Sequence, residues 1–403
     1  MFALAALAVV SCGTQRKTAS SGNAVSKEDV PAGEVVSSLP AQAGDNADCR
    51  LAFGLSLLDA AVSGSSKAAE NIVVSPYSAG MALSMLAEGA AGDTRAEILS
   101  ALKNASYAGD VLKGGEGYSL SSANSIWLRN GFQVVPGYRS LLESAYSAKI
   151  AERDFASPAT VKEINRWCSD NTAGRIPEIV DGISNDMMMF ILNALYFKAP
   201  WKYQFDSNST FKAVFHCPSG VQNTDFMHIK KEFLCGEMEG TRFVVLPYNA
   251  GDWRMVICLP ADGTDAESVA AAVTPAMFKK ALDGADSRDV ALSLPKFKVN
   301  TTLIMNSLLQ KMGVHKAFSG AADFSGITQA GVAVDEVRQK CFIEVNEEGS
   351  EAAAVTSAGI RLTSMRPVEK PFIMNVDRPF LFAIYNAETS DILFAGKIGT
   401  IED

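Results

Sequence analysis

The chain has 403 residues, 48% of them hydrophobic, and a net charge of −9 from 36 lysines and arginines against 45 aspartates and glutamates. This length and composition can bury a large core, and we expect one large domain rather than two. Phosphate binding needs clustered positive charge, so the acidic balance argues against a nucleic-acid-binding surface. The Cys-x-x-Cys and His-Glu-x-x-His spacings and glycine-rich phosphate loops do not occur, and we expect no metal and no cofactor.

The chain starts with a short apolar run that ends at a cysteine. The stretch from Phe2 to Val10 is too short to cross a bilayer as a mature helix. Followed by Ser11 and Cys12, it resembles a bacterial lipoprotein signal. The resemblance implies that residues 1–11 are a signal peptide, that Cys12 is lipidated, and that the exported protein is anchored at the outer membrane or cell surface. The alternative is a short secretory segment followed by an incidental cysteine.

Residues 12–45 are predicted to be a tether. From Gly13 onward they are rich in Ser, Ala, Gly and Pro and contain no aromatic residue, a composition that does not support a packed fold. A flexible chain of roughly thirty residues reaches on the order of 30 Å. We therefore expect the folded domain, residues 46–403, to stand away from the membrane.

Two apolar segments of this domain predict buried elements. Met81, Leu83, Met85 and Leu86 lie in an alanine-rich run, which is typical of a helix buried nearly all round. The segment 380–384 is apolar on both faces, as in a strand that is covered on both sides. Both segments are interpreted as core rather than as binding sites.

Catalytic groups are scarce. The chain has three histidines, His216, His228 and His315, and no Gly-x-Ser-x-Gly motif that would present a nucleophilic serine. His228 and His315 are expected at surface or strand positions rather than in a catalytic triad. We therefore predict that the protein is not an enzyme; a lipoprotein enzyme would lose its activity when one of the three histidines is substituted.

Six cysteines remain after Cys12. Cys258 and Cys341 lie in apolar, strand-like runs, which favours buried free thiols. Export would permit disulfides, and a link between Cys217 and Cys235 stays open as an alternative.

The segment that follows Glu347 reads as a strand that could enter a sheet. From Ser350 on, one face of an extended chain is small or apolar, and the other carries both charges of the segment, Glu351 and Arg361. No proline occurs between Ser350 and Arg366, so the ladder of a sheet could run along the whole stretch. Prolines at 367, 371 and 379 then indicate an exposed return. An ordinary half-buried strand would show the same alternation.

In this segment the chain resembles the hinge and reactive loop of the serpin family, and further motifs in the family's order extend the resemblance over most of the chain. They are Val74-Ser75-Pro76-Tyr77-Ser78, Asn165-Arg166-Trp167, Leu192-Asn193-Ala194-Leu195-Tyr196-Phe197-Lys198 with Trp201 and Phe205, Leu294-Pro295-Lys296-Phe297, Arg378-Pro379-Phe380-Leu381-Phe382 and Leu393-Phe394-Ala395-Gly396-Lys397. The resemblance implies an α+β serpin fold, with three β-sheets, eight or nine helices and an exposed reactive-centre loop. It also implies a monomer.

The resemblance assigns roles to particular residues. The hinge would consist of Glu347, Glu348, Gly349, Ser350, Glu351, Ala352, Ala353 and Ala354. The shutter, a polar cluster beneath the opening of the sheet, would consist of Ser75, Ser78, Asn193 and Gln339, and Trp201 would mark the breach. Many serpins carry a shutter histidine where this chain has Gln339; an amide can satisfy the same partners without titrating.

The resemblance also implies a function, the trapping of serine proteases by loop cleavage and strand insertion. The family's spacing from Glu347 places the scissile bond at Thr363-Ser364, with Arg361, Met365 and Arg366 as alternatives. Elastase-like or trypsin-like serine proteases, and cysteine proteases as a further class, are the expected partners. The alternative is a non-inhibitory serpin that serves as a carrier or a surface binding protein. Its usual sign, a bulky, charged or proline-containing hinge, is absent.

Overall fold

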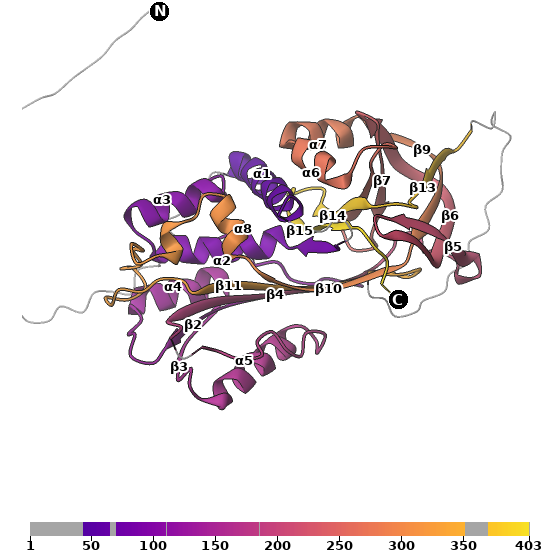
Figure 1. Cartoon of the computed structure of the whole chain (residues 1–403). Helices are drawn as coiled ribbons and strands as arrows, with labels where there is room; N and C mark the ends of the chain where they lie inside the picture. The colour runs from indigo at the N-terminus through magenta and orange to yellow at the C-terminus, as the bar shows by residue number, and fades with distance from the viewer. Residues whose placement is uncertain (1–42, 65–69, 110, 185, 351–369, 403) are drawn as a thin grey trace, which may run out of the picture. The chain divides into compact units, whose positions relative to one another are not determined.

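The computed structural model describes residues 43–64, 70–109, 111–184, 186–350 and 370–402 (Figure 1). The chain divides into two units, residues 1–35 and 36–403, and the described residues all belong to the second. The predicted signal peptide with Cys12, and the predicted tether up to residue 42, lie outside the described residues. The first helix begins at Ala43, three residues before the predicted start of the domain.

The described residues contain eight α-helices, within the expected number. They are α1 (Ala43–Val62), α2 (Pro76–Gly89), α3 (Gly92–Ala101), α4 (Pro136–Tyr146), α5 (Pro158–Asn171), α6 (Ala266–Ala272), α7 (Pro275–Asp283) and α8 (Asn306–Lys311). Helix α2 starts where Ser75 accepts a hydrogen bond from the Ser78 backbone N–H and Pro76 occupies the first turn. All its residues except Glu88 are buried, which confirms the predicted buried helix.

A six-stranded sheet lies against α2. Its strand order is β10 (Phe297–Ile304), β11 (Glu336–Val345), β12 (Gly349–Ser350), β4 (Met189–Pro200), β2 (Ser119–Arg129) and β3 (Lys149–Arg153). Helix α2 covers one face and α5 lies on the other (Figure 1). Since both faces are covered, β4 is apolar along most of its length and buried from Met189 to Phe197.

The second sheet has nine strands. Its order is β1 (Ile72–Val74), β15 (Ile392–Ile398), β14 (Phe380–Asn386), β8 (Trp253–Leu259), β7 (Thr241–Pro247), β6 (Gly220–Met238), β9 (Asp286–Pro295) and β13 (Phe372–Asn375), with β5 (Thr210–Cys217) paired to β6. Strand β14 is buried on both faces, as predicted.

The number of sheets differs from the expected three. Within the described residues hydrogen bonding joins the strands into two sheets, because the 19-residue strand β6 pairs in turn with β5, β9 and β7. One long strand thus connects what would otherwise be two sheets.

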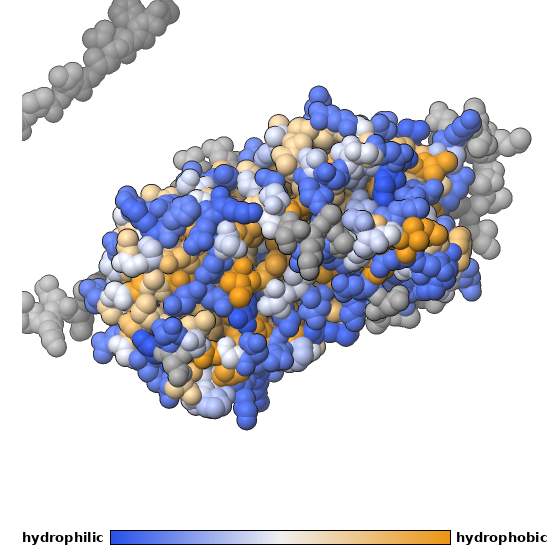
Figure 2. Space-filling view, in the orientation of Figure 1, coloured by the Kyte–Doolittle hydropathy of each residue, from blue (hydrophilic) through white to orange (hydrophobic). Residues whose placement is uncertain are grey.

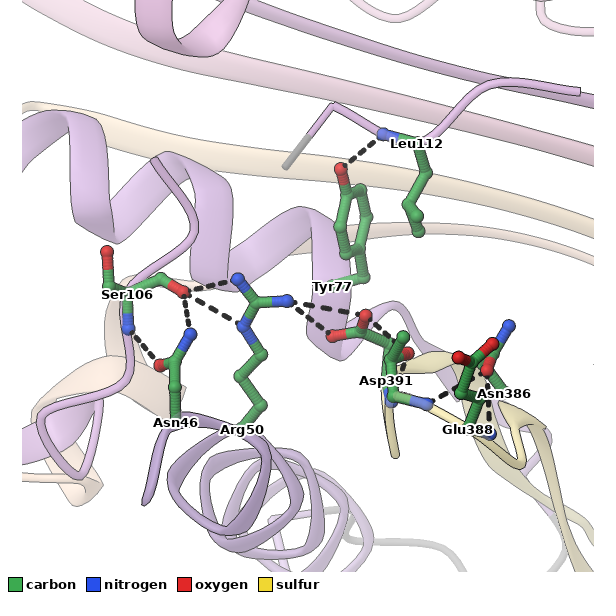
Figure 3. Close-up of polar contacts among 9 residues, drawn as sticks. Asn46, Arg50, Tyr77, Ser106, Leu112, Asn386, Glu388 and Asp391 are labelled. Carbon is green, nitrogen blue, oxygen red and sulfur yellow. Dashed lines mark hydrogen bonds and ion pairs between the residues drawn. The ribbon is translucent and has the colours of Figure 1, made fainter. Parts of the chain in front are cut away.

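A buried polar network ties α1 to distant parts of the chain (Figure 3). Arg50 donates a hydrogen bond of 3.1 Å from Nη1 to Oδ1 of Asp391, and their side chains are 7% and 3% exposed. Its Nε donates to the Ser106 carbonyl at 2.8 Å, and Asn46 both donates to and accepts from the Ser106 backbone. The guanidinium also lies over the Tyr107 ring, 4.6 Å from its centroid. The network therefore fixes α1 to the segment after α3 and to the β14–β15 turn.

The surface is largely hydrophilic on the face that Figure 2 shows, with apolar residues in scattered patches. The exposed large hydrophobic side chains among the described residues are Tyr203, Phe211, Val214, Val221, Ile304 and Ile373. Three of them, Phe211, Val214 and Val221, lie on the β5–β6 hairpin, whereas single surface hydrophobics are ordinary in folded proteins. Among the described helices none combines the length and apolar composition needed to cross a membrane.

Candidate functional site

The six-stranded sheet is closed at one end and forked at the other. Strands β4 and β11 pair in parallel from Phe190 with Glu336 to Leu195 with Cys341; we call this paired stretch the seam. Beyond the seam β12 lies between the two strands and pairs with both in antiparallel register. We call this open end the fork. Gly349 and Ser350, two residues of the predicted hinge, therefore already occupy the fork.

Ser350 faces inward, as the alternation of its segment predicted. Its side chain is buried, and its Oγ lies 2.6 Å from the hydroxyl of Tyr248. The ring of Tyr248 stacks on Trp201, with centroids 4.4 Å apart and planes inclined by 14°. The indole N–H of Trp201 donates to the Asn346 carbonyl at 2.9 Å. The predicted breach residue Trp201 thus packs against Tyr248, which in turn forms a hydrogen bond with Ser350 of the hinge.

Gly349 is required by the close approach of two strands. A Cβ at this position would lie 2.2 Å from the Ala199 carbonyl oxygen, and the φ angle of Gly349 is 157°. Just before it, Oδ1 of Asn346 accepts hydrogen bonds from the backbone N–H groups of Glu348 and Gly349. The chain can therefore turn out of β11 and back into the fork.

Glu347 anchors this turn to a neighbouring strand and loop. Its carboxylate accepts a hydrogen bond of 2.8 Å from Thr210 Oγ1, and Nζ of Lys296 lies 3.1 Å away. Burial raises the pKa of this carboxyl, but the hydrogen bonds from its own backbone N–H, Thr210 and Lys296 outweigh burial, so its pKa lies below the usual 4.5. The carboxylate is therefore charged at neutral pH and holds the hinge at the breach.

This lowered pKa predicts how the hinge anchor responds to acid. A carboxyl with a lower pKa in the folded state stabilises the fold above its unfolded pKa, and the stabilisation is lost as the pH falls through the folded pKa. Glu347→Gln is therefore expected to lower the urea midpoint of unfolding at pH 7, and the difference from the wild type is expected to shrink below about pH 4. A difference that stays constant from pH 7 to pH 3 would contradict this role of the carboxylate.

The predicted shutter residues lie at the middle of the seam. Gln339 is buried and pairs with the backbone of Ser75 in both directions, accepting from its N–H at 2.8 Å and donating to its carbonyl at 2.9 Å. Asn193 lies in register with Gln339 but donates to Oδ1 of Asn124 on β2. Ser78 contacts Ser75 through its backbone N–H. The structure thus brings the four residues to one place, although in separate pairs.

Several site residues were missed by the sequence reasoning. Asn124, Thr210, Tyr248, Lys296 and Asn346 all contact a predicted site residue. The first four lie far along the chain from their partners, and only the strand register brings them together. The proximity of Asn346 to the hinge was a signal in the sequence, since asparagine often caps its own turn. The predicted hinge residues 351–354, and Arg361, Thr363, Ser364, Met365 and Arg366, lie outside the described residues.

Within the described ranges, the contacts of His228 differ from those of a catalytic-triad histidine. His228 Nε2 lies 3.1 Å from the Ser293 hydroxyl, but Nδ1 faces the carbonyls of Ser209 and Phe226 rather than a carboxylate. No cluster of three or more potential metal ligands occurs in the described part of the chain. The alternative disulfide between Cys217 and Cys235 is not formed, because both cysteines are free. Burial raises the pKa of the Cys258 thiol to about 12.

Comparison with known proteins identifies the family. A family model described as serpin (serine protease inhibitor) matches residues 50–400. The leukocyte elastase inhibitor of Sus scrofa is 32% identical, covering 83% of this chain and 94% of its own. The solved structure of tengpin, a thermophilic serpin in the native state, aligns with a TM-score of 0.82 at 30% identity, covering 90% of this chain and 96% of its own. Human thyroxine-binding globulin complexed with thyroxine aligns with a TM-score of 0.80 at 24% identity, covering 89% and 99%. This chain therefore belongs to the serpin family.

Proposed function

We propose that this serpin inhibits serine proteases by trapping them on a cleaved loop. The occupied fork is the observation that carries the proposal, because Ser350 already pairs with both β4 and β11, and Gly349 with β4, in the antiparallel direction that an inserted strand would continue. In the proposed reaction the protease serine attacks the Thr363 carbonyl, the bond to Ser364 breaks, and an ester joins Thr363 to the protease. The freed strand then enters the seam behind Ser350 and carries the protease with it.

The pattern of the loop fits this insertion. Antiparallel pairing with both neighbours would continue from Ser350, and the face that follows it in alternation is small or apolar. A strand of some fifteen residues that gains about 0.5 to 1.5 kcal/mol for each hydrogen bond releases on the order of 10 kcal/mol. This is large enough to distort a docked catalytic site. Insertion must be faster than hydrolysis of the ester, because slow insertion releases a cleaved substrate and an active protease.

The proposed target is an elastase-like serine protease. Leu362 and Thr363 before the scissile bond suit an enzyme with a small, apolar pocket, and the similarity to a leukocyte elastase inhibitor supports the same class. Cleavage after Arg361 or Arg366 would instead indicate a trypsin-like target with an acidic pocket. Met365 is a further candidate position, and cysteine proteases are a further class.

Titration of protease activity tests the proposal. The purified chain is incubated with an elastase-like and a trypsin-like serine protease, residual activity is measured against inhibitor concentration, and the released carboxyl-terminal peptide is sequenced. We expect loss of elastase-like activity near one inhibitor per enzyme and a peptide that begins at Ser364. Full protease activity with complete loop cleavage would contradict inhibition.

A carrier function is the second candidate, and a cavity favours it. A cavity of about 180 Å³ opens between α1, α6, α7 and the larger sheet. Its walls are almost entirely apolar and include Leu55, Leu58, Phe243, Val256, Phe278 and Leu381. A structural relative at 24% identity was solved with thyroxine, which gives the fold a precedent as a carrier. Titration with an apolar fluorescent probe tests the carrier function. A change in probe fluorescence that saturates, and that is smaller in Leu58→Arg, would support a carrier. A linear change that does not saturate would contradict it.

We also propose that the protein is a membrane-anchored lipoprotein at the outer membrane or cell surface, linked through Cys12. The apolar run before this cysteine supports the proposal. Partition of the full chain into detergent, lost in Cys12→Ala, is the expected result. Equal partition of the two forms would contradict lipidation.

A further inference from the structure

One wall of the apolar cavity differs from the others. The larger sheet supplies Phe243, Val256 and Leu381, and α1 supplies Leu55 and Leu58; all five belong to a buried cluster and are at most 7% exposed. Helix α7 supplies another wall, yet none of its nine residues is buried. The cavity therefore has firmly packed walls on the side of the sheet and of α1, and one wall that is only partly packed.

The sequence of α7 explains how this helix can form with so little burial. Four apolar residues with helical spacing share one face and line the cavity: Met277, Phe278, Ala281 and Leu282. The ends of the helix are capped locally, since Thr274 Oγ1 accepts from the Met277 N–H at 3.2 Å and Gly284 follows the last turn. Helix α7 lies on the outside of the fold, next to α6 (Figure 1). It can therefore change position and keep its own hydrogen bonds.

Helix α6, which precedes α7, is firmly held. Three of its seven residues are buried, and its Glu267 pairs at 2.6 Å with Nζ of Lys397, whose side chain is fully buried. Residues 273–274 are the whole connection between the two helices. This link gives α7 a fixed point at its beginning about which it can pivot.

Among the described residues, one ion pair joins α7 to another helix. Nζ of Lys279 pairs with the carboxylate of Asp48 on α1, and we call this pair the clasp. The side chains of Lys279 and Asp48 are 41% and 62% exposed, so the clasp contributes little and is sensitive to salt. A further contact is the edge-on approach of the Phe278 ring to Tyr385 of β14, with centroids 5.5 Å apart. Weak contacts thus hold α7 over the cavity.

The size of the cavity gives this weak attachment a consequence. Its volume is about 180 Å³, whereas sites for small-molecule ligands usually enclose about 300 to 1,000 Å³. A ligand of that size can be enclosed only if a wall moves. Segments with few buried apolar contacts open at the lowest cost in free energy, and α7 is the wall of this kind.

We propose that α7 is a mobile wall, which moves outward when the clasp opens and admits apolar molecules larger than the cavity. In the closed position its apolar face covers the cavity, and in the open position the ligand takes the place of part of that contact. The clasp sets how often the wall opens. The entry of a ligand rests on the proposed carrier function, but the movement of α7 does not.

Stopped-flow binding of diphenylhexatriene, an elongated apolar probe that fluoresces in apolar surroundings, tests the mobile wall in the full chain. Asp48→Asn and Lys279→Met each remove the clasp at an exposed position. We expect the association and dissociation rate constants to rise together by about threefold in either variant, with Kd nearly unchanged, because the same opening limits entry and exit. A changed Kd with an unchanged association rate constant would overturn the proposal, since these residues would then act within the binding site.

Salt gives a second test of the clasp. Added salt screens an exposed ion pair, so both rate constants should rise with salt more steeply in the wild type than in Asp48→Asn. An equal response to salt in the two proteins would contradict the role of the clasp.

Hydrogen exchange without any probe measures the wall alone. The amides of 279–283 should exchange about threefold faster in both clasp variants than in the wild type, while those of α6 stay unchanged.

Asp225→Asn is the matched control. It removes the ion pair of Asp225 with Lys212, which is 3.3 Å long, similarly exposed, and lies on the β5–β6 hairpin. We expect wild-type rate constants and wild-type exchange of α7. Values that are unchanged in both clasp variants, or raised equally in Asp225→Asn, would overturn the proposal. Faster exchange of α7 with unchanged rate constants of a probe that binds would also overturn it, because α7 would then move without controlling entry.

The same measurements separate the mobile wall from the carrier function. If the probe shows no saturable binding but exchange of α7 rises in the clasp variants alone, the carrier function fails and the movement of α7 stands. If the probe binds saturably and the clasp variants change neither the rate constants nor the exchange, the mobile wall fails and the carrier function stands.

Discussion

Ser350→Arg is expected to convert the protein from an inhibitor into a substrate. The side chain at this position is buried in the fork against Tyr248, so an arginine would bring an unpaired guanidinium into the sheet. Burial of an unpaired charge costs several kcal/mol, which corresponds to a decrease of about a hundredfold or more in the rate of insertion. The protease should still cleave the loop, but the ester is hydrolysed before the strand is in place. Denaturing gels should show cleaved product in place of covalent complex.

Ser350→Ala is the control for this prediction. It removes the hydrogen bond to Tyr248 but keeps a small, uncharged side chain that can enter the fork. We expect it to retain most of the covalent complex. If Ser350→Arg traps proteases as well as Ser350→Ala does, insertion does not begin at this residue.

Asp391→Ala is expected to have the largest effect on stability. It removes the carboxylate that pairs with the guanidinium of Arg50, whose side chain is 7% exposed, in the network of Figure 3. Removal of one partner of a buried ion pair typically costs about 3 to 5 kcal/mol, because the other charge stays buried and uncompensated. The measurement is the urea midpoint of the native protein at neutral pH, which should fall strongly.

The double variant Arg50→Met/Asp391→Leu tests the reason for this effect. It removes both charges and keeps apolar volume, a change that is often close to neutral for a buried pair. We therefore expect it to be more stable than Asp391→Ala. Equal loss in the two variants would show that packing around Arg50 and Asp391, rather than the loss of their ion pair, determines the effect.

The sequence contained much of the fold, because the pattern of buried residues is a local property. The buried helix around Met81 to Leu86, the doubly covered strand 380–384 and the inward face of Ser350 follow from periodicity and are confirmed by the burial of these residues. The family resemblance added the order of the elements and the positions of Gln339 and Trp201. The number of sheets could not be predicted, because the continuity of β6 depends on which strands it pairs with.

The contacts of the site required the structure, since they depend on register between distant strands. Asn124 and Asn193 are 69 residues apart, and Tyr248 and Ser350 are 102 apart. A shift of one residue in either strand would point these side chains to opposite faces. The hydrogen bonding of the shutter in two separate pairs, Gln339 with Ser75 and Asn193 with Asn124, could not be predicted either. The sequence shows which residues are polar but not which of them bind each other.

Intact mass spectrometry of the chain incubated with an elastase-like serine protease tests the central claim most directly. Trapping of the protease predicts a species that survives denaturation. Its mass equals that of the protease plus this chain, minus that of the released peptide from Ser364 to the carboxyl terminus. A chain cleaved at the same bond, together with free, fully active protease, would contradict it and would favour a serpin that does not inhibit.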